Sequence, residues 1–227
     1  MRSRLTTLLT VLGLSMALGV VSAPAAQADV PCTITNVSPR SVVVGLTPIV
    51  KTFRVSTSGC SLDGWNIWAD DFFIFDDSPQ ETFTPWFNSE AGPQDVVVDA
   101  YNSDYTKRSR VFPDGFSLLR RTTWQDKSFN ASPEPAKRGS AIAVTGRLLV
   151  VDWTNERYVP YAKRSVAVEF RTPTGSYTHV KTVTTDTNGW VRTTVPANAT
   201  GTWRLRYGGN SVAGPAVSAG DTVQVVR

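Results

Sequence analysis

The fold of this protein is decided by residues 201–207, which read Gly-Thr-Trp-Arg-Leu-Arg-Tyr. Apolar residues occupy every second position, at Trp203, Leu205 and Tyr207, and polar residues stand between them. Successive side chains of a β-strand point to opposite faces, so this period of two predicts a strand with one buried face. The Gly-Gly-Asn sequence at 208–210 is typical of the turn that would follow.

The same alternation recurs through the second half of the chain, within 142–150, 166–170 and 223–225. Turn sequences at 172–175 and 186–189 separate these runs, and no helical period of 3.6 interrupts them. Roughly seven short strands of this kind are typical of an immunoglobulin-like β-sandwich. Residues 140–227 are therefore predicted to form such a module, with Trp203 in its core.

The first half of the chain shows a less regular version of the same pattern, with alternating or continuous apolar runs near 53–55, 65–67, 72–75, 96–98 and 116–118. We predict a second all-β module over residues 29–129. Residues 130–139 read Asn-Ala-Ser-Pro-Glu-Pro-Ala-Lys-Arg-Gly, where apolar periodicity stops and proline, glycine and charge accumulate. Such a composition predicts a linker between two tandem sandwiches.

The first 28 residues have the pattern of a cleavable signal peptide. Arg2 and Arg4 precede an apolar stretch over residues 5–21, and the small-residue site Ala-Gln-Ala follows at 26–28. Polar and small residues interrupt the stretch, which favours cleavage over a retained anchor. The sequence predicts a secreted, extracellular protein with no membrane insertion after cleavage.

Two cysteines, Cys32 and Cys60, lie in the predicted mature chain. An even cysteine count in an oxidising compartment predicts a disulfide. The loop that it would close contributes roughly 3.5 kcal/mol to stability on chain-entropy grounds.

The balance of charge argues against nucleic-acid binding. The whole chain has a formal net charge of +4, and loss of Arg2 and Arg4 with the signal leaves 21 basic against 19 acidic residues. Nucleic-acid-binding domains usually carry a concentrated basic surface. Adjacent basic residues such as Arg120 and Arg121 would point to opposite faces of a strand and form no single patch.

Several stretches resemble a family of secreted actinobacterial two-domain proteins with bacterial immunoglobulin-like repeats. The resemblance is carried by residues 36–45, 128–135, 144–148, 170–177 and 207–210, and it extends over nearly the whole mature chain. It implies tandem immunoglobulin-like modules and an extracellular location. Some members of the family carry a calcium-binding label, although no ligand motif can be transferred to this sequence.

Catalytic chemistry finds little support in the sequence. The mature chain has one histidine, His179, and no Gly-x-Ser-x-Gly nucleophile motif or glycine-rich phosphate loop. Zinc sites usually draw on several histidines or cysteines. Glycoside hydrolysis needs only two carboxylates. However, Glu134 lies in the predicted linker, and Glu169 is out of phase with its apolar neighbours, which predicts a solvent-facing position. We therefore predict a non-enzymatic protein.

Exposed aromatic rings could instead bind a carbohydrate, because β-sandwich modules commonly use them as sugar platforms. Trp65 and Trp68 have opposite parity, so only one of them can face the core of a strand. Trp86 beside Pro85 could form a loop platform. The alternative is that these rings fill the core or the junction between modules. The implied partner would be a cell-wall or surface polysaccharide.

Calcium is the one cofactor that the residues suggest, since carboxylate oxygens are its preferred ligands. Two acidic pairs, Asp70 with Asp71 and Asp76 with Asp77, bracket an apolar run. If residues 70–77 form one strand, the pairs lie about 20 Å apart, whereas ligands of one ion lie within about 5 Å of each other. Either pair would then need acids from another loop. The alternative is that these charges keep an aromatic strand soluble.

The sequence as a whole predicts a secreted, non-enzymatic, two-module protein that acts as an extracellular binding or structural component. The alternative function is calcium binding or carbohydrate binding.

Overall fold

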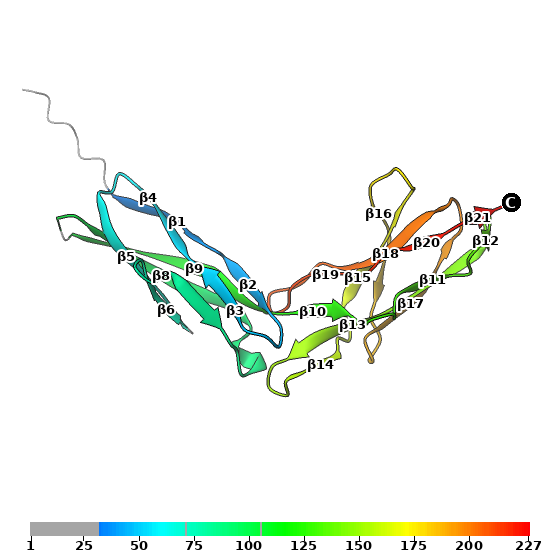
Figure 1. The fold of residues 1–227 in the computed structure, drawn as a ribbon, viewed down its shortest axis with the longest axis horizontal. Helices are drawn as coiled ribbons and strands as arrows, with labels where there is room; N and C mark the ends of the chain where they lie inside the picture. Colours follow the sequence, from blue (N-terminus) through cyan, green and yellow to red (C-terminus); the bar gives the residue numbers. More distant parts are fainter. Residues whose placement is uncertain (1–31, 71, 105) are drawn as a thin grey trace, which may run out of the picture. The chain divides into compact units, whose positions relative to one another are not determined.

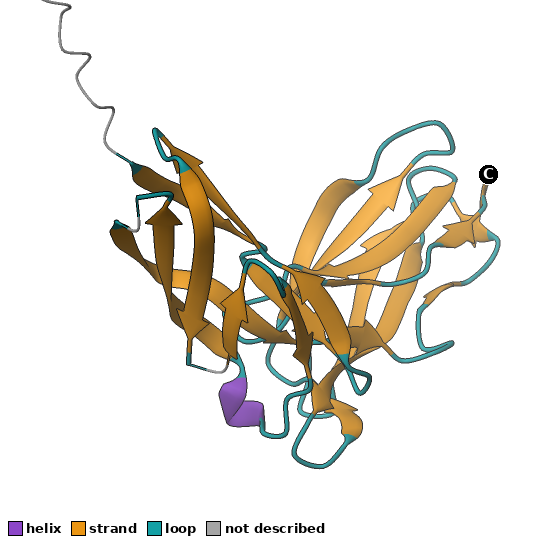
Figure 2. Ribbon diagram, turned by 60° about the vertical axis from the view of Figure 1, so that its left-hand side comes forward, coloured by secondary structure: helices purple, strands orange, loops and turns teal. Residues whose placement is uncertain are grey.

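The computed structural model describes residues 32–70, 72–104 and 106–227. The predicted signal peptide, residues 1–28, and Asp71 lie outside these ranges. The described chain is almost entirely β-structure, with one short 3-10 helix at Asn88–Glu90 (Figures 1 and 2). None of its helices is long and apolar enough to cross a membrane. The predicted all-β class is confirmed, and the chain forms two immunoglobulin-like β-sandwiches.

The first module is built on a five-stranded sheet (Figure 1). Its strands, in spatial order, are β2 (Ser41–Val44), β9 (Lys107–Arg120), β8 (Gly92–Asn102), β5 (Leu62–Ala69) and β6 (Phe72–Phe75). Two strand pairs complete the module, β1 (Thr33–Ser38) with β4 (Arg54–Ser58), and β3 (Ile49–Thr52) with β7 (Gln80–Phe83).

Aromatic rings form the centre of the first core. Phe53 packs against Phe72, Phe83 and Phe116, with ring centroids 5.1, 6.3 and 5.7 Å away. All four rings are buried, and they come from four separate segments of the chain. Because burying one phenylalanine side chain is worth about 2–3 kcal/mol, this cluster is a major source of the module's stability.

The second module has two five-stranded sheets. One contains β10 (Thr122–Trp124), β11 (Asn130–Ser132), β13 (Ala141–Asp152), β14 (Arg157–Pro160) and β17 (Trp190–Pro196). The other contains β15 (Ser165–Arg171), β16 (Thr178–Thr184), β18 (Gly201–Tyr207), β19 (Ala216–Val217) and β20 (Asp221–Val223). A short parallel pair joins β12 (Ala136–Lys137) to β21 (Val225–Val226).

Residues 201–207 form strand β18 with one buried face, as their alternation predicted. Trp203, Leu205 and Tyr207 are all buried in the second core, with Trp203 only 4% exposed. Arg204 and Arg206 point to the other face of β18. The predicted core position of Trp203 is confirmed.

The segment predicted as a linker is structured, which corrects that expectation. Within residues 130–139, β11 pairs with β13 and β12 pairs with β21, so the segment belongs to the sheets of the second sandwich. Ala131 and Ala136 are fully buried in its core. Pro133 and Pro135 lie in the bend between β11 and β12, where no ladder hydrogen bond needs the amide donor that proline lacks. Strand pairing with β13 begins even earlier, at β10.

A hairpin of the second module completes the core of the first. Val151 near the end of β13 and Trp153 in the turn that follows lie in the first hydrophobic cluster, where they are 0% and 4% exposed. The indole Nε1 of Trp153 donates a hydrogen bond to the carbonyl of Gly45 at 3.1 Å. Where the chain passes from β9 to β10, the carbonyl of Arg121 accepts a hydrogen bond of 2.9 Å from the backbone N–H of Val151. All described residues accordingly belong to one compact unit.

Cys32 and Cys60 form a disulfide, as predicted. Their Cα atoms lie 4.4 Å apart because β1 and β4 are antiparallel neighbours, with Thr33 opposite Ser58. The bond therefore joins the start of β1 to the residues that follow β4. No free cysteine remains among the described residues.

Candidate functional site

The three tryptophans predicted as a ligand platform lie in different places. Trp65 is partly buried against the first core, whereas Trp68, three residues along β5, is 50% exposed on the opposite face of the sheet. Trp86 lies in the segment after β7 and is 69% exposed. Trp65 and Trp68 thus follow the parity argument, and the three rings do not form one surface.

Trp68 belongs to an aromatic cluster that sequence analysis only partly identified. Its ring centroid lies 4.6 Å from that of Phe73 on the neighbouring strand β6, and Phe73 lies 4.4 Å from Phe75. We call Trp68, Phe73 and Phe75 the outer-face cluster. All three rings are substantially exposed. The signal for the two phenylalanines was available, since only alternate residues of the run 72–75 can face the core.

Beside the outer-face cluster, on the same face of the sheet, lies a set of polar side chains linked by hydrogen bonds. The Trp68 indole Nε1 donates to Asn66 Oδ1 at 2.7 Å, and Asn66 Nδ2 donates to the Tyr101 hydroxyl at 3.2 Å. Opposite Asn66 in register is Asp99 on β8. The Asp99 carboxylate accepts hydrogen bonds from the hydroxyl of Ser109 and from Lys107 Nζ, the latter at 3.3 Å. Because Asn66 is itself bound to Tyr101, its hydrogen bond with Trp68 holds the indole in one orientation.

The predicted calcium ligands are separated by the length of a strand. Asp70 lies in the turn between β5 and β6, while Asp76 and Asp77 follow β6 at its other end. Asp71 lies outside the described residues. In the part of the chain that the structure describes, no three residues of the His, Cys, Asp and Glu types come together to hold a metal ion. Calcium binding stays a prediction of the sequence.

We expect calcium at millimolar concentration to shift the thermal midpoint of the mature protein by less than about 2 °C. The reason is that Asp70 and Asp76 lie at opposite ends of β6 and cannot share an ion. The measurement is a melt with chelator and then with calcium. A larger shift that magnesium does not reproduce, and that is lost in the double variant Asp76→Asn and Asp77→Asn, would restore the calcium assignment.

The structure also places the titratable groups weighed for catalysis. His179 is exposed, and its Nε2 lies 2.9 Å from the hydroxyl of Thr182. Glu169, expected to face solvent, is instead only 5% exposed, because Arg204 and Arg206 cover it from the adjacent strand β18. Its carboxylate lies 2.7 Å from Arg204 Nε and 2.5 Å from Arg206 Nε.

Glu81 and Glu90 line one cavity of 240 Å³. Burial raises the pKa of the Glu81 carboxyl, and a hydrogen bond from the backbone of Thr82 opposes that rise. Glu90 has a structural task, since its Oε1 accepts hydrogen bonds from the backbone N–H groups of Trp86 and Phe87 at 2.9 and 2.7 Å. These bonds anchor the segment that presents Trp86.

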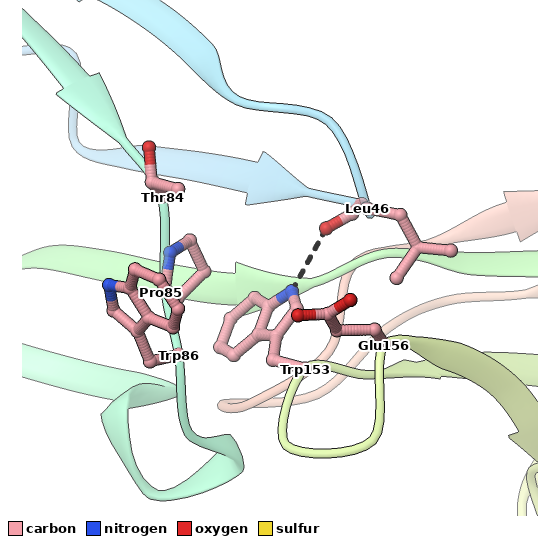
Figure 3. A pocket seen from close by; sticks show the side chains of 7 residues that line it. Leu46, Thr84, Pro85, Trp86, Trp153 and Glu156 are labelled. Atoms are coloured by element: carbon pink, nitrogen blue, oxygen red, sulfur yellow. Dashed lines mark hydrogen bonds between the residues drawn. The ribbon is translucent and has the colours of Figure 1, made fainter.

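A larger cavity of 380 Å³ also has Trp86 among its lining residues (Figure 3). It is lined by Gly45, Leu46, Thr84, Pro85, Trp86, Trp153 and Glu156. Figure 3 shows the Trp153 indole between Trp86 and Glu156 in this view, with its hydrogen bond to Gly45. Trp86 was predicted as part of a platform, but no local pattern indicates that Trp153, far away in the sequence, lines the same cavity.

Comparison with known proteins yields neighbours in structure only. No protein-family model matches the chain, and no curated protein matches it. Among solved structures, fibronectin(III)-like modules of Clostridium thermocellum CbhA match 86% of this chain and 93% of theirs at 14% identity, with a TM-score of 0.38. Three N-terminal domains of the outer capsid protein Hoc of bacteriophage RB49 match 86% and 70% at 12% identity, with a TM-score of 0.36. The D00-D0 domain of intimin matches 83% and 98% at 14% identity, with a TM-score of 0.31.

Proposed function

We propose that this protein is an exported, non-enzymatic binding protein that holds a polysaccharide on the outer face of the sheet formed by β6, β5, β8 and β9. The observation that carries the proposal is the exposed indole of Trp68, which is locked by its hydrogen bond to Asn66 and flanked by Phe73.

An exposed aromatic cluster on a folded surface indicates a binding site, because water is displaced favourably from its apolar rings. The C–H groups of a pyranose ring form an apolar surface that can stack on an indole. A tryptophan whose orientation is already fixed loses little conformational freedom when the sugar arrives. The outer-face cluster offers this contact on rigid strands.

Sugar recognition also needs polar partners for the hydroxyl groups, placed beside the apolar contact. On the same face, Ser109, Lys107 and the half-buried Tyr101 can supply donors and acceptors. The buried Asn66 and Asp99 hold them in place by hydrogen bonds. The side chain of Lys107 is 51% exposed, so its ammonium group can reach a bound hydroxyl. Aromatic and polar contacts lie side by side, which favours a carbohydrate over a purely apolar partner.

The non-enzymatic part of the proposal is supported by how the carboxylates are used. Glu169 is paired with two arginines, and Glu90 binds two backbone N–H groups. The two arginines favour the ionised form of Glu169, and the two backbone N–H groups hold the Glu90 carboxylate in place. A glycosidase would need one carboxyl as proton donor and a second at a fixed distance across a cleft.

We expect Trp68→Ala to weaken retention of the mature protein on an insoluble bacterial cell-wall polysaccharide by roughly tenfold. The physical reason is the loss of the stacking surface, while Asn66 and the strand remain. The measurement is a depletion isotherm on the isolated polysaccharide. The matched control is Phe87→Ala, which removes a ring that is 60% exposed but lies outside the outer-face cluster.

If both variants bind the polysaccharide as well as the unaltered protein does, Trp68 is not part of the binding site. Release of reducing ends from the polysaccharide during the same incubation would contradict the non-enzymatic proposal. A loss of binding in Trp68→Ala that is not matched in Phe87→Ala would support a site on the outer face.

A further inference from the structure

We propose that the cavity lined by Trp86, Trp153 and Glu156 is a second binding site, and that its ligand is an organic ammonium group. This inference is independent of the outer-face cluster, since the two sites share no residue.

The cavity has two aromatic walls, and one of them, the Trp153 indole, is fixed in place. Trp153 is buried and its Nε1 is bound to the Gly45 carbonyl, so its indole is immobile. The Trp86 side chain is exposed, but its backbone N–H donates a hydrogen bond to the Glu90 carboxylate. The π-face of an indole carries negative potential, and a cation placed over it is attracted electrostatically. Two such rings lining one cavity favour a positively charged ligand with an apolar body.

Glu156 supplies the formal negative charge. It lies in the turn between β13 and β14, and its carboxylate makes no hydrogen bond or ion pair with any residue that the structure describes. No lysine or arginine is among the described residues that line the cavity. The side chain of Arg121 packs beside Gly45 but does not line the cavity. An anionic ligand would be repelled by this carboxylate, and a neutral one would gain nothing from its charge.

The volume of 380 Å³ limits the ligand to one small group or one sugar unit at a time. Two kinds of ligand present the required chemistry, a quaternary ammonium head group and the free amine of an amino sugar. Both place a positive charge next to C–H groups that can contact an indole. The shared chemistry is an organic ammonium, and the experiment separates the two sources.

The test is calorimetric titration of the full mature protein with choline and with glucosamine, as chloride salts in matched sodium chloride. Each cation has a neutral counterpart of similar shape, 3,3-dimethylbutan-1-ol for choline and glucose for glucosamine. We expect at least one cation to bind, with its neutral counterpart roughly tenfold weaker.

Two variants locate the binding. Glu156→Gln keeps the shape and removes the charge, and Trp86→Ala removes one wall. We expect each variant to lower the affinity for the cation by roughly tenfold. Both side chains are exposed, so the thermal midpoint should stay unchanged. Asp77→Asn is the charge-matched control and should bind the cation as the unaltered protein does.

Binding of choline alone would support the site and assign it to quaternary ammonium ligands, and binding of glucosamine alone would assign it to amino sugars. Three results would each overturn the proposal: no binding of either cation at millimolar concentration, equal binding of the neutral counterparts, or full affinity in Glu156→Gln. Retained binding to the polysaccharide in the Glu156 variant would leave the outer-face proposal standing.

Discussion

Replacing Trp153 with alanine is expected to lower the free energy of unfolding by about 3–5 kcal/mol, the usual cost of truncating a buried aromatic side chain. Trp153 is 4% exposed and lies in the first hydrophobic cluster, although it belongs to the turn between β13 and β14 of the second module. The substitution also leaves the Gly45 carbonyl without the hydrogen bond from the indole. Both losses fall on the first module.

The measurement is urea denaturation combined with amide hydrogen exchange. We expect faster exchange in β2, which ends beside Gly45, and in β9, whose Leu118 lies in the same cluster. Trp86→Ala is the control, because that tryptophan lines the same cavity but is 69% exposed, and its loss should change stability by about 0.5 kcal/mol or less. A cost below about 1 kcal/mol for Trp153→Ala would show that the hairpin does not complete the first core.

The second large effect is expected where Arg204 and Arg206 meet Glu169. Replacing both arginines with alanine should cost about 2–4 kcal/mol at neutral pH, because a buried carboxylate is then left without a counter-charge. The range is set below that of a fully buried pair because the side chain of Arg206 is 45% exposed. Removing the carboxylate as well, with Glu169→Gln, should recover part of the loss.

The pH dependence of this loss has a definite sign. Burial raises the pKa of the Glu169 carboxyl, but hydrogen bonds from Arg206 and Arg204, together with their charges, outweigh it and hold that pKa below its ordinary value. The stabilisation is therefore present above the ordinary glutamate pKa, and it disappears as the pH falls through the lowered one. Without the arginines only burial remains, so Glu169 should take up a proton more readily.

Denaturation at several pH values tests this prediction. The difference in stability between the unaltered protein and the double-arginine variant should shrink as the pH falls below about 4. Arg192→Ala is the control, because its ion pair with Asp186 is exposed to solvent on both sides and should contribute little to stability. A difference that stays constant with pH would mean that the loss comes from packing of the arginine side chains and not from charge.

The candidate sites were predictable only in part. The parity of Trp65 and Trp68 required one ring to face outward, and the same rule applied to the run 72–75 would have added Phe73 and Phe75. Parity cannot show which polar residues lie beside them. Asn66 and Asp99 are neighbours because β5 and β8 pair in one register, and that register depends on the whole sheet.

Local pattern determined the secondary structure, the class of fold and the buried face of strands such as 201–207, because side-chain alternation is a property of each strand alone. It could not determine what covers each face. Proline and charge in residues 130–139 predicted a linker, yet β13 offered an edge with which β11 could pair. Glu169 alternates as a solvent-facing residue should, yet arginines from β18 cover it. Trp153 completes a core built from residues 32–120. These outcomes depend on contacts between segments that are distant in the sequence. Such contacts form, and contribute to stability, only when the whole chain has folded.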